Sequence, residues 1–462
     1  MLAHPATWRR FIPLLAMLLL IAVPASAQMA ANQPPALTPA QMREDLTYLK
    51  TQWAPLDKSF SKEEHQAFDR VVDDAMAASG TLSTEEFTLE VMRAVAISRN
   101  GHTTAMVGTL LRDLPVRAWW FSDGLYIIKT DPQFANLLGA RIDKLGALTP
   151  KEALRRVAPF ISGTDQRIRY LSATFLTSPD VLKRTGAVAD SSSIPLTLQL
   201  RDGSSQVAEL KPATTRDPGD EHKPATRGYS VLIPDDNGLP GRWPHVLDKA
   251  EERSPIYSKR IDVTTSMIGQ DKQVLYIRAN SMTSLDETSL HWKYAKILNT
   301  SIVPPSRPKF VIFDLRLNNG GDFFNTILFS QALPKLLPPG GHIFVLVSRS
   351  TFSAAIVTTA MLKANGQDKV TLIGETMGDN GQFWAEGDAL QMPNSHIGLE
   401  YATQFEDYEK GCTNPDKCYW ATVAFGPRNL TSLAPDIKVD VAFSDYAAGR
   451  DPVLEKALSL AK

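Results

Sequence analysis

The pattern of polar and hydrophobic residues changes character twice along the chain, and the first stretch is typical of short helices. Three sequences in it place a hydroxyl residue three positions before Glu or Gln, beginning at Thr38, Ser61 and Ser83. Such sequences mark capped helix N-termini, because the paired side chains satisfy otherwise unpartnered backbone amides. Asn100-Gly101 interrupts the pattern, so we expect a small helical domain that ends at this turn.

In the second stretch, from Leu114 to about Leu210, short β-type runs surround one helical segment near Thr149–Val157. The clearest runs are Leu125–Ile128 and Ile194–Leu200. This mixture predicts a small α+β module. The residues that follow, up to 245, are rich in Pro, Gly, Asp and Arg and are typical of a connector.

Beyond residue 272, strand-like and helix-like segments alternate. Apolar runs at 274–279, 310–315, 343–347 and 370–374 predict strands, and segments at 285–299, 325–333 and 353–364 predict the helices between them. Strands joined by single helices imply right-handed crossovers and a mainly parallel sheet. Ligands of such sheets bind beyond the carboxyl ends of the strands, so we expect a functional site there.

The first 27 residues have the pattern of a secretory signal peptide. Arg9 and Arg10 precede the apolar run Phe11–Val23, and Ala25-Ser26-Ala27 fits a cleavage site. The apolar run is short for a membrane span, and an uncleaved anchor is the alternative. We therefore expect a periplasmic or secreted protein with no stable membrane insertion after cleavage. The expected division is a signal peptide at 1–27, a helical domain at 28–108, an α+β module at 109–215, a linker at 216–245 and an α/β core at 246–462.

Composition narrows the classes of function. Hydrophobic residues make up 43% and charged residues 21% of the 462 residues, which excludes a disordered or fibrous protein. The chain has 49 basic and 50 acidic residues and no long basic run, so we expect no nucleic-acid partner. No spacing of His, Cys and carboxylates suits a metal and no phosphate-binding loop is present, so we expect no cofactor. The expected partner is a peptide or protein substrate.

The two cysteines, Cys412 and Cys418, are too few for a disulfide-built scaffold. In an exported chain they favour one local disulfide, with two free thiols as the alternative. We expect the loop that they close to help shape the substrate cleft, with apolar contact area from Tyr419 and Trp420. A surface insertion without such a role is the alternative.

Three loops at the expected strand ends carry residues that suit acyl transfer. Ser353 begins an apolar helix, whose unpaired amides would stabilise the charge that forms when a serine oxygen attacks a carbonyl. Paired glycines after the strand at 310–315 let backbone amides converge on an anion, so we predict an oxyanion hole from Gly320, Gly321 and Ala354.

A serine nucleophile also needs a base, for which His102 is the candidate, and Glu375 offers a carboxylate at another strand end. Each feature has an ordinary structural alternative. Paired glycines form turns, a serine before a helix is often an N-cap, and a histidine or glutamate in a loop is often solvated.

These residues lie in motifs that resemble those of the tail-specific (carboxy-terminal processing) proteases, a family of serine peptidases. The resemblance covers nearly all of the chain after the signal. It implies a crotonase-like (ClpP-like) α/β core, and Gly139–Gly146 resembles part of a PDZ-like peptide-binding module. The matching motifs are Val311–Arg316 with Asn319–Gly321, Thr351–Ala355, Gly374–Thr376, Ala434–Ile437 and Gly449–Pro452.

Two departures from the family pattern direct the expected mechanism. Asn380 occupies the position at which Ser/Lys members carry their lysine, so the resemblance implies the tricorn-like branch, which uses Ser and His with a carboxylate. His102 in Gly-His-Thr resembles the histidine of that branch. Its glutamate before the Pro-Asp motif is replaced here by Arg428-Asn429-Leu430, so Glu375 becomes the first candidate to orient His102.

The resemblance thus implies an exported serine-type peptidase that hydrolyses peptide bonds through an acyl-enzyme on Ser353. Some relatives bind hydrophobic ligands without hydrolysing them, as the retinoid-binding proteins of the eye do. The alternative is therefore a non-catalytic periplasmic protein of the same fold that binds peptides or hydrophobic ligands.

Overall fold

The structure, a computed structural model, describes residues 36–108, 110–214, 229–234, 241–258, 262–269, 273–284, 288–303, 307–426, 430 and 432–462. The expected signal peptide at 1–27 lies outside these residues, and so does most of the expected linker at 216–245.

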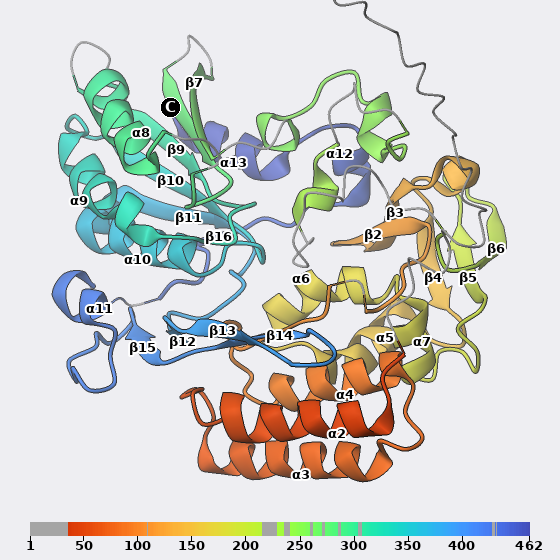
Figure 1. The fold of residues 1–462 in the computed structure, drawn as a ribbon. Helices are drawn as coiled ribbons and strands as arrows, with labels where there is room; N and C mark the ends of the chain where they lie inside the picture. The colour runs from red at the N-terminus through yellow and green to blue at the C-terminus, as the bar shows by residue number, and fades with distance from the viewer. Residues whose placement is uncertain are drawn as a thin grey trace, which may run out of the picture. The chain divides into compact units, whose positions relative to one another are not determined.

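The three predicted helix starts are confirmed. Thr38, Ser61 and Ser83 each form a complete capping box, in which the hydroxyl accepts from the third helical amide and the Gln or Glu there accepts from the cap amide. The helices are α2 (Pro39–Tyr48), α3 (Lys62–Ala78) and α4 (Thr84–Ala96), and α3 packs against both of the others. They form the red and orange layer of Figure 1. Their shared core is aromatic, with Trp53, Phe68 and Phe87 fully buried.

The middle of the chain forms the expected mixture of strands and helices. Its antiparallel sheet contains five strands in chain order, and the β4–β5 connection contains α5 (Pro150–Val157), α6 (Asp165–Phe175) and α7 (Pro179–Arg184). α6 packs against β2, where the Trp120 indole donates to the Ser172 hydroxyl at 3.0 Å. The likeness to a PDZ module stays a prediction. The strands are β2 (Val116–Phe121), β3 (Gly124–Thr130), β4 (Arg141–Leu145), β5 (Ile194–Gln199) and β6 (Ser205–Leu210).

The predicted parallel sheet is also confirmed. Its order is β16-β11-β10-β9-β8-β7, and all neighbours are parallel except the β7–β8 pair. The four central strands, β8 to β11, are almost wholly buried on both faces, so they read as continuous apolar runs, whereas the edge strands β7 and β16 are partly exposed. The strands are β7 (Val263–Ile268), β8 (Val274–Ala279), β9 (Phe310–Asp314), β10 (His342–Val347), β11 (Val370–Gly374) and β16 (Ile437–Lys438).

Helices cover both faces of this sheet (Figure 1). α8 (Leu290–Ile297), α9 (Ile327–Leu336) and α10 (Ala354–Gly366) share one apolar core with one face of the strands. α13 (Pro452–Leu460) packs on the opposite face. The carboxyl ends of β9, β10 and β11 therefore form one edge from which three loops leave.

A buried ion cluster ties this edge to α13. The Arg316 guanidinium donates to Asp314 Oδ2 and to Asp451 Oδ1, each at 2.6 Å, and all three side chains are nearly inaccessible. Asp451 also caps α13 by accepting from the Leu454 amide. The Asp-Leu-Arg and Asp-Pro motifs are thus joined in space, and their carboxylates hold the fold together.

The helical segment is connected to the core by short strands. β1 (Ala105–Met106) pairs with β14 (Gly398–Tyr401), which pairs with β13 (Asp388–Gln391). The Asp57 carboxylate supports this connection, because it accepts from both the Thr103 hydroxyl and the Ala402 amide. The chain from Ala36 onward clusters as one compact unit, so the expected boundaries divide it by type of element.

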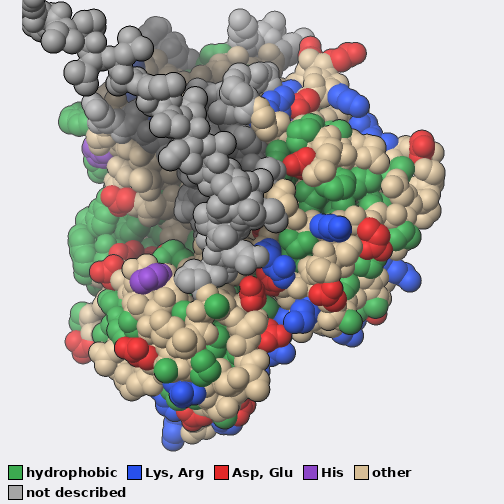
Figure 2. Space-filling model, turned by 45° about the vertical axis from the view of Figure 1, so that its right-hand side comes forward, with side chains coloured by type: hydrophobic (Ala, Val, Ile, Leu, Met, Phe, Trp, Pro, Cys, Tyr) green, Lys and Arg blue, Asp and Glu red, His purple; other side chains and the backbone are tan. Residues whose placement is uncertain are grey.

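On the face that Figure 2 shows, basic and acidic side chains are interspersed. None of the described helices has both the length and the apolar character needed to span a bilayer.

Candidate active site

Ser353 lies in a strained turn between β10 and α10. Its φ is 53° and its ψ is −127°, in a region that residues with a Cβ rarely adopt. The turn is held because the Phe352 amide donates to the Asn318 carbonyl, and the Ile356 amide donates to the Ser353 carbonyl. A sharp strand-to-helix turn of this kind is how hydrolases of other folds expose a nucleophilic serine.

The glycine loop after β9 lies directly against Ser353. A Cβ built on Gly320 would come within 2.6 Å of the Ser353 Cβ and 3.1 Å of the Ala354 nitrogen, so no other residue fits there. Gly320 has a φ of 102°, which also favours glycine. The sequence-predicted residues Ser353, Gly320 and Ala354 are therefore brought together.

The amide groups of the predicted oxyanion hole differ in their bonding. The Gly320 N–H already donates to the Asn318 side chain at 2.8 Å. The Ala354 and Gly321 N–H groups donate to no acceptor among the described residues. The Ala354 amide, at the positive end of α10, is thus the best-placed donor for a developing negative charge.

His102 lies in a stack of aromatic rings. Its ring is stacked on Phe352 at 4.5 Å and on Phe383 at 5.2 Å between centroids. Both ring nitrogens are buried, and neither has a hydrogen-bond partner among the described residues. Burial, aided by the positive charge of Arg167, lowers the pKa of His102 to about 3. The imidazole is therefore neutral at ordinary pH.

Glu375 is not brought to His102. Its carboxylate lies 3.3 Å from Arg349 Nη1, and it borders a small cavity with Trp120 and Tyr257, separate from the cavity that His102 lines. Glu375 directly follows β11, and its amide donates to the Val347 carbonyl. Its side chain points toward Arg349.

Asp379, four residues further along, lies next to the histidine turn. A Cβ built on Gly101, the residue before His102, would lie 3.2 Å from Asp379 Oδ2. Oδ1 accepts from the Asn380 amide, while Oδ2 is buried without a partner among the described residues. Burial raises the pKa of Asp379 to about 7, against the opposing effects of the Asn380 amide and Arg167.

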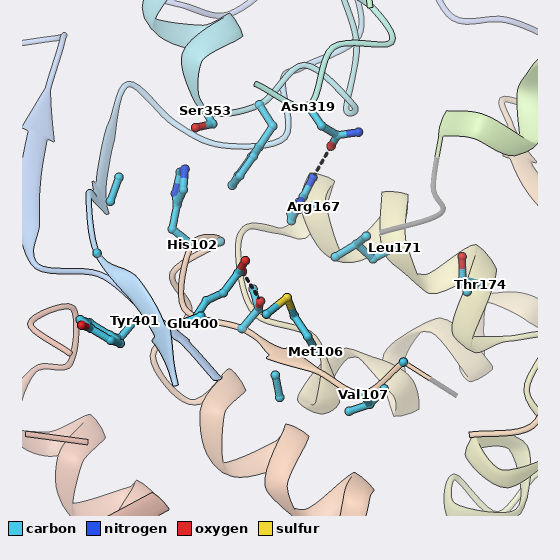
Figure 3. Close-up of a pocket in the computed structure, with 18 of the residues that line it drawn as sticks. His102, Met106, Val107, Arg167, Leu171, Thr174, Asn319, Ser353, Glu400 and Tyr401 are labelled. Carbon is cyan, nitrogen blue, oxygen red and sulfur yellow. Dashed lines mark hydrogen bonds between the residues drawn. The ribbon is translucent and has the colours of Figure 1, made fainter. Parts of the chain in front are cut away.

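Ser353 and His102 line one cavity of about 510 Å³. Figure 3 shows His102, Ser353, Asn319 and Arg167 around one end of it, and Met106, Val107, Leu171 and Thr174 toward the other. β1 contributes one wall, and Ala385–Ala389 contribute another. Among the described residues, no group of three or more His, Cys, Asp or Glu side chains could hold a metal ion.

The predicted disulfide is present between Cys412 and Cys418. Its ring is fixed to β15 (Gln404–Asp407), because Phe405 bonds to the backbone of Lys417 and Tyr419. Neither the ring nor Tyr419 and Trp420 line the cavity that holds Ser353. Trp420 instead is 59% exposed and stacks on Phe324, just beyond the glycine loop.

Sequence reasoning missed α6 and its Arg167, which lines the cavity and donates to Asn319 at 2.8 Å. A signal was present, since Thr164 caps the helix and Ile168, Leu171 and Phe175 follow at helical spacing. Asp379 was also missed as a site residue, although it lies in the same loop as Glu375.

No protein-family profile and no curated protein matches the chain by sequence. Among solved structures, mature CPAF complexed with lactacystin is similar with a TM-score of 0.56 at 13% identity, over 92% of this chain and 98% of that chain. Mature CPAF gives 0.57 at 12% identity, over 92% and 97%. A photosystem II D1 C-terminal processing protease gives a TM-score of only 0.37 at 10% identity, over 89% of this chain and 98% of that chain. The chain therefore has the fold of mature CPAF, which confirms the expected α/β class.

Proposed function

We propose that this chain is an exported serine-type peptidase of the carboxy-terminal processing kind, which cleaves peptide bonds through an acyl-enzyme on Ser353. The observation that carries the proposal is the strained conformation of Ser353 at a helix start, with the Ala354 amide unpaired beside it and Gly320 packed against it. An N-cap serine would have extended backbone and a side chain bonded to the helix, and Ser353 has neither.

The proposed chemistry follows from these groups. Ser353 Oγ attacks the scissile carbonyl carbon as its proton passes to His102, and the carbonyl oxygen becomes an oxyanion bound by the amides of Ala354 and Gly321. The histidine then gives the proton to the leaving amine as the C–N bond breaks. Water hydrolyses the ester by the same route. Gly320 can join the oxyanion hole only if its bond to Asn318 opens.

Asp379 replaces Glu375 as our candidate for the carboxylate that orients His102. Both Asp379 Oδ2 and the ring nitrogens of His102 are buried and unpartnered among the described residues. A buried polar group without a partner is costly, so a hydrogen bond between the two that forms when substrate binds would be favourable. Hydrogen bonds of a catalytic site often tighten only in the substrate complex.

The cavity suits a peptide or protein substrate. It is lined largely by apolar side chains such as Met106, Val107 and Leu171, with Ser353 at one end. This arrangement favours a substrate whose apolar side chains extend along the cavity away from Ser353. Export is supported by the signal-like sequence at 1–27 and by the Cys412–Cys418 disulfide, since disulfides persist outside the cytosol.

One observation favours the second candidate, a non-catalytic binding protein of the same fold. His102 makes no hydrogen bond to Ser353, and its ring is held between two phenylalanines. In that case the apolar cavity alone would hold a peptide or hydrophobic ligand.

Labelling with a fluorophosphonate separates the two candidates. A peptidase should be modified stoichiometrically at Ser353, and Ser353→Ala should lose the label while keeping its melting temperature. The same substitution should also abolish cleavage of a peptide library by the protein. Absence of both labelling and turnover in the intact chain would support the binding protein, and tryptophan-fluorescence titration with lactacystin and apolar peptides would then measure binding.

A further inference from the structure

Helix α6 holds the loop of the predicted oxyanion hole through Asn319. Arg167 Nη1 donates to the Asn319 side-chain oxygen at 2.8 Å, and the Asn319 nitrogen donates to the Tyr170 hydroxyl at 2.7 Å. Both ends of one amide are thus fixed by one face of α6. Since Gly320 follows Asn319 and packs against Ser353, the position of α6 sets the position of the glycine loop beside Ser353.

Arg167 also contacts the aromatic stack that contains His102. Its guanidinium carbon lies 3.9 Å from the centre of the Phe352 ring, and that ring is stacked on His102. Phe352 is itself the residue before Ser353. The cation therefore touches, through one ring, both the candidate base and the backbone that presents the nucleophile.

Arg167 has no ordinary reason to be buried. Its side chain is 5% exposed and lines the cavity, yet no carboxylate lies within ion-pair distance of it among the described residues. Its Nε atom is buried without a partner there. Burying an unpaired charge is destabilising, so its stability contribution does not explain it. The guanidinium contacts are instead the Asn319 amide and the rings of Phe352 and Tyr170.

We propose that Arg167 is a positioning residue of this site, which with Tyr170 fixes both the Asn319–Gly321 loop and the Phe352–His102 stack for acyl transfer. The inference rests on the proposed function. It gives the α+β module a direct part in the chemistry, because α6 belongs to that module and the loop belongs to the parallel sheet.

The positive charge has an additional, measurable effect. The charged and titratable groups that act on Arg167 are Tyr170 from α6, Asp379 from the loop after β11 and Glu400 from β14. The same cavity is also lined by Glu386 after β12 (Gln382–Ala385), Asp388 and Asp113. Arg167 lowers the pKa of both His102 and Asp379. A neutral residue at position 167 should therefore raise both pKa values, and the pH at which Asp379 ionises should increase.

The test uses the full chain with the variants Arg167→Met, Arg167→Lys and Tyr170→Phe. Arg169→Met is the matched control, because Arg169 lies on the same helix and over the Trp120 ring but contacts no site residue. For each variant we would measure kcat and KM on one cleaved peptide, the fluorophosphonate labelling rate of Ser353 from pH 5 to 9, and the melting temperature.

We expect Arg167→Met to lower kcat and the labelling rate by about tenfold or more, with KM changed little, and to move the pH midpoint upward. Arg167→Lys should keep the midpoint, because the charge remains, and recover part of the rate. Tyr170→Phe should lower kcat by about threefold to tenfold with the midpoint unmoved, as expected for one lost hydrogen bond. Arg169→Met should match the wild type.

The results also separate the two proposals. If the wild type itself is neither labelled nor active, the proposed function fails. If the wild type is active and the folded Arg167→Met variant keeps its kcat, labelling rate and pH midpoint, the positioning role is wrong. If Arg167→Met lowers the melting temperature but leaves kcat and the labelling rate of the folded fraction unchanged, Arg167 contributes only to stability and the positioning role is likewise wrong.

Discussion

Gly101 and Asp379 lie close enough that a Cβ on Gly101 would be 3.2 Å from Asp379 Oδ2 and 2.7 Å from Phe352 Cε2. His102 is the next residue. The absence of a side chain at position 101 thus lets the histidine turn approach the serine turn and the carboxylate at once.

The close approach of the His102 turn to the Ser353 turn should depend on Gly101. Gly101→Ala should lower kcat/KM by about tenfold or more, because a 2.7 Å contact forces Phe352, and with it Ser353, to shift. The melting temperature should fall by a few degrees at most. Gly80→Ala is the control, since a Cβ there meets nothing within 4 Å. Equal activity of the two variants would show that the turn can accommodate a methyl group at position 101.

His102→Ala should lower turnover by at least about 100-fold, the lower end of what a positioned general base contributes. Steady-state hydrolysis of a peptide measures this effect. Circular dichroism should show a folded protein. A variant that retains the wild-type rate would place the base elsewhere in the chain.

Asp379 should set the pH dependence of activity. Because its pKa is raised to about 7, kcat/KM should rise with pH through that value, whereas His102, with a pKa of about 3, stays neutral over the same range. Asp379→Asn should lower the rate and remove the inflection. Glu375→Gln is the control and should leave the inflection in place. An inflection that survives in Asp379→Asn would exclude this carboxylate.

The same group should affect stability with a defined sign. A carboxyl group whose pKa is raised on folding binds its proton more tightly in the folded state, so the free energy of unfolding should fall as pH rises from the ordinary value of 3.8 to about 7. Asp379→Asn should flatten that part of the curve. Urea denaturation at a series of pH values measures the slope.

The Arg316–Asp451 pair should matter for stability. Burial alone would raise the pKa of Asp451, but the ion pair with Arg316 outweighs it and holds that pKa below the usual value. Asp451→Asn should cost about 3–5 kcal/mol in the free energy of unfolding, since it leaves a buried charge poorly compensated. The contribution should also fade in acid, as pH falls through the lowered pKa. Asp445→Asn, at a more exposed ion pair, should cost far less.

Replacing Cys412 and Cys418 by serine should lower the free energy of unfolding by only about 2 kcal/mol or less, because the closed ring is short. The melting temperature should move by about a few degrees. If the loop shapes substrate binding through Trp420, the Michaelis constant or peptide preference should change. A large fall in melting temperature with unchanged kinetics would show that the disulfide stabilises the fold and does not shape substrate binding.

Much of the core could be predicted because parallel strands buried on both faces are continuous apolar runs. β8 and β11 begin and end where the sequence places them, and β9 and β10 differ by one residue. The capping boxes at Thr38, Ser61 and Ser83 succeed for a similar reason, since their signal is local.

The direction of side chains in irregular loops could not be predicted. Glu375 and Asp379 occupy one loop, and the bond from the Gly378 amide to the Thr351 carbonyl turns the chain between them. Glu375 consequently faces Arg349, and Asp379 faces Gly101. That bond joins two separate loops, so no local pattern encodes it.

The pairing of β1 with β14 has a consequence for the timing of activity. A ribosome makes His102 early, Ser353 late, and β14 later still. A growing chain therefore displays the candidate base without the candidate nucleophile, and even after Ser353 has emerged it lacks the strand that pairs with β1, just after His102. Under the proposed function, hydrolytic competence would therefore arise only after β14 has been made and has paired with β1.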